Sequence, residues 1–220
     1  MPGKFSAGNR CCISLIANTP EKQLRYYAAI ETRINGLENL VDNLSSLSTL
    51  NSKRFAFDLE NTELNQYFKT KISKLQNTYN PRNIFITYIS SSEPIFVNID
   101  HKEMDRVTTN IIENSIKYRT NTNSNLEISL KKDNNFANLR FKDDGPGVKT
   151  RDLNHLFDSF YRGDASRTKP DEGSGLGLAI VKQIIIDQGG KVFAENNNGL
   201  AIIIHLPIAK EEHNEKNINN

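Results

Sequence analysis

The longest regular pattern of apolar residues lies near the N-terminus, between Gln23 and Leu50, and no proline interrupts it. Apolar residues recur there at steps of three and four, which is the spacing of a heptad seam on an α-helix. The seam consists of Tyr27, Ile30, Ile34, Leu37, Val41 and Leu44, with Leu40 and Leu47 on one flank. The pattern predicts a helix about 40 Å long. Its start is marked by Thr19 as the cap, Pro20 in the first turn and Glu21 beside it.

A lone amphipathic helix of this length must bury its apolar stripe against a partner. That partner is either the rest of this chain or a second copy, with which helical hairpins would form a four-helix bundle. We favour a homodimer, because the seam begins before any strand that can cover it. Ser6–Ala17 is interpreted as the end of a preceding antiparallel helix, joined by a turn at Asn18–Pro20. Residues 1–52 are therefore predicted to form a partial dimerisation hairpin.

Beyond Leu50, helical and alternating patterns interleave, which is typical of an α+β domain. Helical spacing predicts helices at Thr62–Leu75, His101–Tyr118 and within Gly173–Gln188. Alternation predicts strands at Phe55–Leu59, Asn83–Ile89 and Ile95–Ile99, and two hairpins, Leu126–Lys132 with Phe136–Phe141 and Lys191–Ala194 with Ala201–Leu206. We expect the domain to cover residues 53–209 and a polar, disordered tail to cover residues 210–220.

The composition restricts the class of protein. Hydrophobic residues make up 37% and charged residues 25% of the 220 residues, enough for one core of ordinary size with a smaller appendage. The net charge of +2 gives no large basic field, so we expect no nucleic-acid binding. Adjacent Cys11 and Cys12 cannot frame a disulfide scaffold, which indicates a reducing cytoplasm. No apolar run approaches the roughly 20 residues of a membrane span, so we expect no membrane insertion of this chain, although the parent protein can be membrane-anchored.

Several familiar site motifs are missing from the sequence. There is no G-x-x-x-x-G-K-[ST] phosphate loop and no H-R-D or D-F-G element. Gly173–Leu178 lacks the last glycine of the dinucleotide-binding G-x-G-x-x-G motif and follows no predicted strand. The 4 histidines are scattered, and no Cys/His cluster has the spacing of a zinc site.

One candidate site lies on the predicted helix His101–Tyr118. Asn110, Asn114 and Lys117 share one face of that helix. The face offers two carboxamide oxygens and an ammonium group, which suit a magnesium ion and phosphate oxygens. Taken alone, such side chains usually form a solvated helix face.

Two glycine-containing motifs follow along the chain. Asp143-Asp-Gly-Pro-Gly147 comes at the end of a predicted strand and, taken alone, is a turn signal. A carboxylate in this place can also accept a hydrogen bond from an exocyclic amine, while glycines let the backbone approach a flat ring. Gly173-Ser-Gly-Leu-Gly-Leu178 opens a predicted helix, where N–H groups and the helix dipole attract anions. Alone, this motif is also weak.

In this order, the three motifs resemble the catalytic domain of sensor histidine kinases of two-component systems, within the ATPase superfamily that includes Hsp90 and gyrase. The segment Leu156–Arg167 looks like that family's phenylalanine box, which leads into a mobile lid over ATP. The resemblance extends from Gln23 to about Pro207. It implies a two-layer α/β sandwich, with helices on one face of a mixed, mostly antiparallel sheet, preceded by a helical hairpin. It also implies ATP and Mg²⁺ as cofactors.

The resemblance further implies roles around the phosphates. Asn114, with Asn110 beside it, would hold Mg²⁺, and Lys117 would contact the phosphates. The glycine-rich loop would wrap the triphosphate through Gly173, Gly175 and Gly177, with Leu176 and Leu178 on its packing side. Around the base, Tyr118 would pack near the adenine and Asp143 would accept a hydrogen bond from its amino group.

The remaining implied roles concern space for the base and the lid. Gly145 and Gly147 would leave room for the adenine. Phe157 and Phe160 would anchor the lid, and simple core packing is the alternative for both. Arg162 would reach toward phosphate.

The chain departs from this family at the phosphoacceptor. The acceptor histidine should precede the long helix, but no histidine occurs before His101. The sequence thus predicts a protein-histidine kinase that transfers the ATP γ-phosphoryl group to a histidine absent from this chain, and thence to an aspartate of a response regulator, whose receiver domain would dock near Leu37–Leu47. Autophosphorylation of this chain alone is not expected. The alternatives are a catalytically silent, ATP-responsive dimerisation or regulatory module and an anti-sigma-type serine kinase, against which the heptad hairpin argues.

Overall fold

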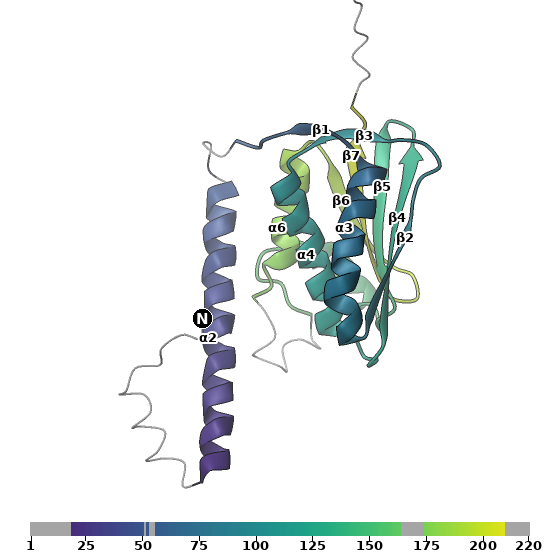
Figure 1. Ribbon diagram of the computed structural model, residues 1–220. Helices are drawn as coiled ribbons and strands as arrows, with labels where there is room; N and C mark the ends of the chain where they lie inside the picture. The colour runs from purple at the N-terminus through teal and green to yellow at the C-terminus, as the bar shows by residue number, and fades with distance from the viewer. Residues whose placement is uncertain (1–18, 51, 53–55, 164–173, 210–220) are drawn as a thin grey trace, which may run out of the picture.

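The computed structural model describes residues 19–50, 52, 56–163 and 174–209, and shows a helical layer packed on one face of a sheet (Figure 1). The sheet has the strand order β2-β4-β5-β7-β6. Its strands are β2 (Ile84–Ile89), β4 (Ser124–Asp133), β5 (Phe136–Asp143), β6 (Lys191–Asn196) and β7 (Leu200–Pro207). The β2–β4 pair is parallel and the other pairs are antiparallel. The predicted mixed, mostly antiparallel sheet is confirmed.

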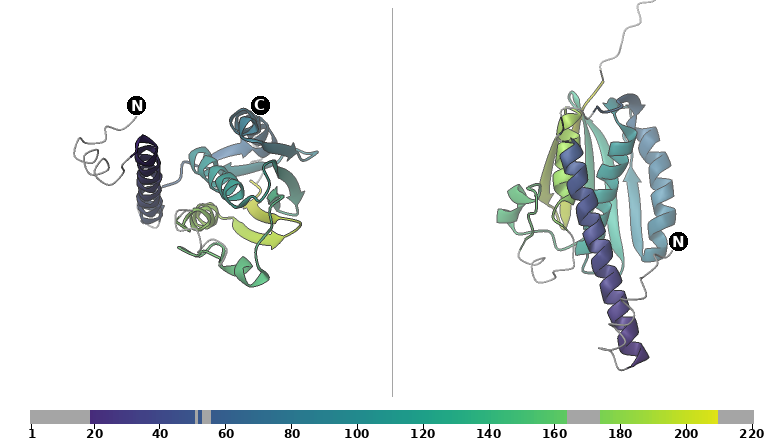
Figure 2. Two further views of the ribbon diagram at one scale, coloured as in Figure 1. Left: turned by 90° about the horizontal axis from the view of Figure 1, so that it is seen from below. Right: turned by 90° about the vertical axis from the view of Figure 1, so that its left-hand side faces the viewer.

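Three helices cover the same face of this sheet, as Figure 2 shows from two further sides. They are α3 (Leu64–Tyr79), α4 (His101–Tyr118) and α6 (Gly177–Asp187). A separate two-stranded sheet pairs β1 (Glu60–Glu63) with β3 (Phe96–Ile99). Short 3₁₀ turns lie at Asn80–Arg82, after α3, and at Thr150–His155, after β5. The predicted two-layer sandwich is therefore present.

Alternation along β5 shows how the strands build the core and deliver one carboxylate to it. Ala137, Leu139 and Phe141 are buried toward the helices, while the residues between them are partly exposed. Asp143 ends the strand in the same inward register and is buried as well. A period of two thus places a charged group at the edge of an apolar layer.

Helix α4 is fixed at its start by Asp100. One carboxylate oxygen of Asp100 accepts a hydrogen bond from the amide of Glu103 at 3.1 Å, which is a helix N-cap. The other accepts from the amide of Asp58 at 3.1 Å. The amide of Asp100 donates to Oε1 of Gln188, just beyond α6, at 2.9 Å. One residue therefore joins the N-terminus of α4 to the segment before β1 and to the end of α6.

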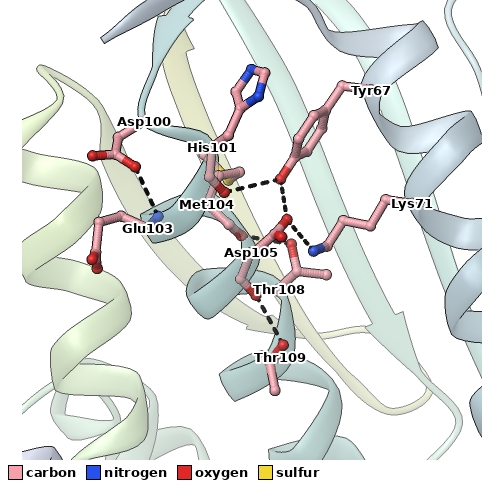
Figure 3. Close-up of polar contacts among 9 residues, drawn as sticks. All are labelled: Tyr67, Lys71, Asp100, His101, Glu103, Met104, Asp105, Thr108 and Thr109. Carbon is pink, nitrogen blue, oxygen red and sulfur yellow. Dashed lines mark hydrogen bonds and ion pairs between the residues drawn. The ribbon is translucent and has the colours of Figure 1, made fainter. Parts of the chain in front are cut away.

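A polar cluster joins α3 to the first half of α4 (Figure 3). Asp105 accepts hydrogen bonds from the Tyr67 hydroxyl, at 2.5 Å, and from the Lys71 ammonium group. Desolvation, followed by the hydrogen bond to Asp105, raises the pKa of Tyr67 far above its usual value. His101 and Thr62 contribute a further bond, with 2.6 Å between Nε2 and Oγ1.

The predicted long helix is confirmed as α2 (Pro20–Leu50). The hydroxyl of Thr19 accepts a hydrogen bond from the amide of Lys22 at 3.3 Å, so Thr19 is the cap, as predicted. The seam faces solvent in this single chain: Leu37 is 64% exposed and Val41 is 60% exposed. At the C-terminal end, Leu50 is buried in the core of the domain.

An open cleft of about 490 Å³ lies between α2 and the start of α4. Asp42 lines it from α2, and Lys102, Glu103 and Arg106 line it from α4. The Glu103 side chain is buried, and within the described part of the chain its Oε2 makes no hydrogen bond, although Nη1 of Arg106 lies 3.6 Å away. Packing between the two helices is therefore incomplete at this point.

Two sequence predictions need correction, and others lie outside the described residues. The predicted strand Phe55–Leu59 is wrong: residues 56–59 have no regular structure, because the amide of Asp58 bonds to Asp100 instead of to a neighbouring strand. The helix predicted to begin at Thr62 begins at Leu64, since Glu63 caps it by accepting from the amides of its first turn. The predicted helix 6–17, the tail 210–220 and Gly173 belong to the parts of the chain that the structure does not describe.

Candidate functional site

Two of the three motifs meet the second half of α4 from either side. A methyl group added at Gly177, the first residue of α6, would lie 3.2 Å from Oδ1 of Asn110. A methyl group added at Gly145 would lie 3.9 Å from the carbonyl oxygen of Tyr118. The fold thus places the start of α6 beside Asn110 and the turn after β5 beside the end of α4.

One carboxylate oxygen of Asp143 accepts hydrogen bonds from the described backbone, and the other does not. Oδ1 accepts hydrogen bonds from the amide of Gly145 at 3.0 Å and from the amide of Leu200 at 2.8 Å. Oδ2 makes no hydrogen bond to any described residue. The two amides fix the orientation of the group, so Oδ2 is a positioned acceptor at a buried place.

The turn after β5 is held by Asn196, at the end of β6. Its side chain accepts from the amide of Val148 at 3.0 Å and donates to the carbonyl oxygen of Val148 at 2.6 Å. Gly147 has φ +68°, and a methyl group there would lie 2.7 Å from Oδ1 of Asn196. Only glycine fits this turn without displacing Asn196.

Asn110, Asn114 and Lys117 lie on one face of α4, here called the asparagine face. The two asparagine side chains there make no hydrogen bond that holds the described part of the chain together. The side chains of Asn110 and Asn114 are partly buried, and neither makes a hydrogen bond to a described residue. Lys117 donates to the hydroxyl of its neighbour Tyr118 at 2.9 Å, and its ammonium group lies 4.6 Å from the centre of that ring. This face therefore offers two amide oxygens and one cation to a ligand.

The start of α6 supplies backbone donors. The first turn contains no acidic residue, and the first N–H groups of an α-helix have no partner within the helix. Leu176 is fully buried and occupies the N-cap position, where its side chain makes no cap hydrogen bond, and the Ser174 hydroxyl accepts from the amide of Leu176 at 3.3 Å. An anion is the ligand that such an end favours.

The phenylalanine box contacts this loop through its backbone. The amide of Phe160 donates to the carbonyl oxygen of Gly175 at 3.0 Å. Gly175 has φ +70°, and a methyl group there would lie 2.8 Å from the carbonyl oxygen of Tyr161. Phe157 is buried in the core, whereas the Phe160 ring is 59% exposed. Phe157 therefore packs in the core, and Arg162 follows Phe160 at the edge of the described segment.

The sequence reasoning assigned no role to two residues that hold the turn after β5 in place. Asp144 accepts from the Ser124 hydroxyl at 2.9 Å and from the amide of Asn125 at 2.8 Å. Partial burial acts to raise the pKa of Asp144, but hydrogen bonds from Asn125 and Ser124 outweigh it and hold that pKa below its usual value. Asn196 is the other missed residue; its only signal was the run of asparagines before Gly199.

Comparison with known proteins decides the family. A family model described as "Histidine kinase-, DNA gyrase B-, and HSP90-like ATPase" matches residues 99–210. The chain belongs to this ATPase family. The matched range contains the asparagine face of α4, Asp143 and the loop before α6.

Relatives of this ATPase-family chain are sensor histidine kinases. The chain is 28% identical over 194 residues to the sensor histidine kinase WalK of Bacillus subtilis (strain 168), and the alignment covers 87% of the chain and 32% of WalK. The chain thus spans about a third of the length of this curated relative.

Solved structures agree. The mycobacterial sensor histidine kinase MprB matches with a TM-score of 0.58 and 26% identity, over 68% of this chain and 98% of that chain. The histidine kinase ThkA, in complex with the response regulator protein TrrA, matches with a TM-score of 0.72 over 93% of this chain and 57% of that chain. At 21% identity, this structural match shows a common fold and no more.

Two features are absent from the part of the chain that the structure describes. No helix there combines the length and the hydrophobicity of a membrane span. Nor do three or more His, Cys, Asp or Glu side chains gather there as a metal site.

Proposed function

We propose that this chain is the ATP-binding kinase region of a two-component sensor histidine kinase. It transfers the γ-phosphoryl group of ATP to a histidine supplied from outside this chain, and thence to an aspartate of a response regulator. Residues 53–209 form the ATP-binding domain, and residues 1–52 contribute part of a dimerisation hairpin. Membership of the ATPase family and the sensor histidine kinase relatives support this proposal.

The observation that carries the proposal is the carboxylate of Asp143. Its Oδ1 is fixed by two amides, and its Oδ2 makes no hydrogen bond to the described residues. An amino group on a flat base fits this acceptor, since Gly145 and Gly147 remove side chains from the adjoining turn. Tyr118, at the end of α4, lies beside the same turn.

The phosphates would lie toward Asn110 and the start of α6. Asn110 and Asn114 provide hard oxygen donors, which suit a Mg²⁺ ion that takes most of its other ligands from phosphate and water. When bound, that ion would neutralise phosphate charge. Lys117 adds a positive charge, and the loop Gly175–Leu176–Gly177 would present the N–H groups of Gly177 and Leu178 to the anion. Gly173 and Arg162 complete the proposed set.

The chain's contribution to phosphoryl transfer is positioning and charge neutralisation. Asp143 orients the base, and the loop before α6 holds the phosphate chain relative to it. The nucleophile is an imidazole nitrogen of the acceptor histidine. No described histidine lies on α2: His101 bonds to Thr62, and His155 bonds to Asp158.

The long helix fits the proposed assembly. Its exposed seam, which includes Ile34, Leu37 and Val41, would be buried by a second copy in a homodimer. A receiver domain of a response regulator would dock on the same hairpin, near Leu37–Leu47. ThkA, a protein of the same fold, was solved in complex with a response regulator.

The test is calorimetric titration of the chain with ATP and Mg²⁺. Saturable binding is expected, and Asp143→Asn should weaken it by about 1.5–3 kcal/mol, because a charged acceptor is lost at a buried place. Asp144→Asn is the matched control: both oxygens of Asp144 are used within the protein, so thermal stability should fall while affinity is kept. Absence of binding by the folded wild type would overturn the proposal and favour the silent regulatory module.

A further inference from the structure

A second buried carboxylate lies beside the proposed site, in a segment to which none of the motifs assigns a role. Asp152, in the 3₁₀ turn Thr150–His155, is 7% exposed. Its Oδ1 accepts a hydrogen bond from the Tyr161 hydroxyl at 2.8 Å, and Nε of Arg151 lies 3.6 Å from the same oxygen. Burial of a carboxylate is unfavourable unless it is paired, so these contacts hold Asp152 and Tyr161 together.

The other oxygen of Asp152 faces the end of the same segment. A methyl group added at Gly163 would lie 3.2 Å from Oδ2 of Asp152. Asp152 is therefore bonded to Tyr161 on one side of Arg162 and lies close to Gly163 on the other. Asp152 thus lies beside the backbone on either side of Arg162, the residue proposed to reach toward phosphate.

Tyr161 in turn touches the glycine-rich loop. Its carbonyl oxygen would lie 2.8 Å from a methyl group at Gly175, and the preceding amide, of Phe160, donates to the carbonyl oxygen of Gly175. Phe160 itself has φ +64°, a left-handed conformation that a bulky residue adopts only when its surroundings impose it. The contacts run from Asp152 through Tyr161 and Phe160 to Gly175.

We infer that Asp152 is a positioning residue for the triphosphate: through the Tyr161 hydroxyl it holds the backbone of residues 160–163 against the loop that wraps the phosphates. This inference rests on the proposed function, because it assumes that ATP binds between Asp143 and Gly175. It assigns Asp152 no contact with the nucleotide. The adenine end of the site, at Asp143, lies on β5 and is held by the separate contacts of Leu200 and Gly145.

A role in stability alone makes a different prediction from a role in positioning. If Asp152 only stabilises the fold, its loss should lower the melting temperature and leave the ratio of affinities for ATP and AMP unchanged. If it positions the phosphate loop, the affinity for ATP should fall while that for AMP stays the same, because both nucleotides share the adenine contacts.

The experiment measures ATP, ADP and AMP binding by competition against a fluorescent ATP analogue, for the whole chain, four test variants and one control variant. Asp152→Ala should weaken ATP about tenfold and AMP less than about twofold, since a hydrogen bond to a charged acceptor is lost. Tyr161→Phe should give a similar loss, and the double variant should be no weaker than Asp152→Ala, because both substitutions break one contact. Asp152→Asn, which keeps an oxygen acceptor, should restore most of the ATP affinity.

Asp158→Ala is the matched control, since this carboxylate belongs to the same segment but bonds to the exposed His155, at 2.9 Å. Equal losses for ATP and AMP, additive losses in the double variant, or a lower melting temperature with unchanged affinities would overturn the inference. A folded wild type that binds none of the three nucleotides would overturn the proposed function instead.

Discussion

The two halves of helix α4 use their polar side chains in different ways. In the first half they are consumed by the fold: Asp105 accepts from Tyr67 and Lys71, and the hydroxyls of Thr108 and Thr109 return to backbone carbonyls at 2.9 Å (Figure 3). In the second half, Asn110 and Asn114 bond to no described residue. Both halves bury the same kind of apolar stripe, which runs from Met104 to Ile112.

This contrast separates residues that hold the helix in place from residues that the helix presents. The contacts of Asp100 and Asp105 fix the position of α4 near its start. The second half extends from that fixed start to the region between Gly145 and Gly177. Glu113 is an exception there, because it accepts a hydrogen bond from Tyr79 of α3, at 2.8 Å, and so belongs with the fold.

The largest expected effect comes from removing an asparagine side chain from the second half of α4. Asn114→Ala should weaken ATP binding in Mg²⁺ about thirtyfold, or about 2 kcal/mol, while the free energy of unfolding changes by less than about 0.5 kcal/mol. Titration calorimetry with Mg²⁺ and with a chelator, beside urea unfolding, measures both. A loss that is the same in the chelator would mean that Asn114 acts without the metal ion.

Breaking the first half should give the opposite result. Asp105→Ala should lower the free energy of unfolding by about 1 kcal/mol, which is less than the roughly 1.5–3 kcal/mol of buried bonds to a charged group, because the Asp105 side chain is 59% exposed. ATP affinity should be retained. Urea unfolding and nucleotide titration test this, and a variant that is stable but binds ATP weakly would contradict the division of the helix.

The contacts of Asp105 also predict that the free energy of unfolding falls in acid. Burial acts to raise the pKa of Asp105, but hydrogen bonds from Lys71 and Tyr67 outweigh it, so the pKa lies below its usual 3.8. A lowered pKa contributes stability above the unfolded value, which is lost as pH falls through the folded value. Stability of the wild type should therefore fall below about pH 4 more steeply than that of Asp105→Ala.

The smallest effect is expected at Glu113, the residue of the second half of α4 that belongs with the fold. Desolvation, and next the hydrogen bond to Glu113, raise the pKa of Tyr79 to about 12. The stability linked to this shift is complete below pH 10 and is lost as pH rises through 12. Glu113→Gln should lower that pKa, seen as earlier tyrosinate absorbance, and leave ATP affinity unchanged. Weaker ATP binding in this variant would place Glu113 with Asn114 after all.

Local patterns in the sequence predicted the elements well where periodicity was long. The heptad seam predicted α2, and alternation predicted both hairpins, because a period of two or of three to four is a property of a single segment. The strand at Phe55–Leu59 was wrong for the opposite reason: its alternation is real, but the amide of Asp58 bonds to Asp100, far along the chain.

The residues of the candidate site also fall into those that the sequence predicts and those that it does not. Asn110, Asn114 and Asp143 belong to short motifs whose residue types carry their chemistry, so the sequence predicts them. Asn196 and Asp152 act through contacts with Val148 and Tyr161 that depend on the folded backbone. No spacing rule points to such residues, because an asparagine or aspartate of this kind looks like any polar residue in a loop.

The cleft between α2 and α4 bears on how firmly the long helix is joined to the ATP-binding domain. A carboxylate oxygen buried without a hydrogen bond, as at Glu103, raises the free energy of the closed arrangement, and water relieves that penalty when the surfaces part. Burial of Leu47 and Leu50 favours packing of α2 on the domain, and the unbonded oxygen of Glu103 opposes it. The packing of α2 on the domain therefore contributes less to the free energy of folding than the burial of Leu47 and Leu50 alone would give.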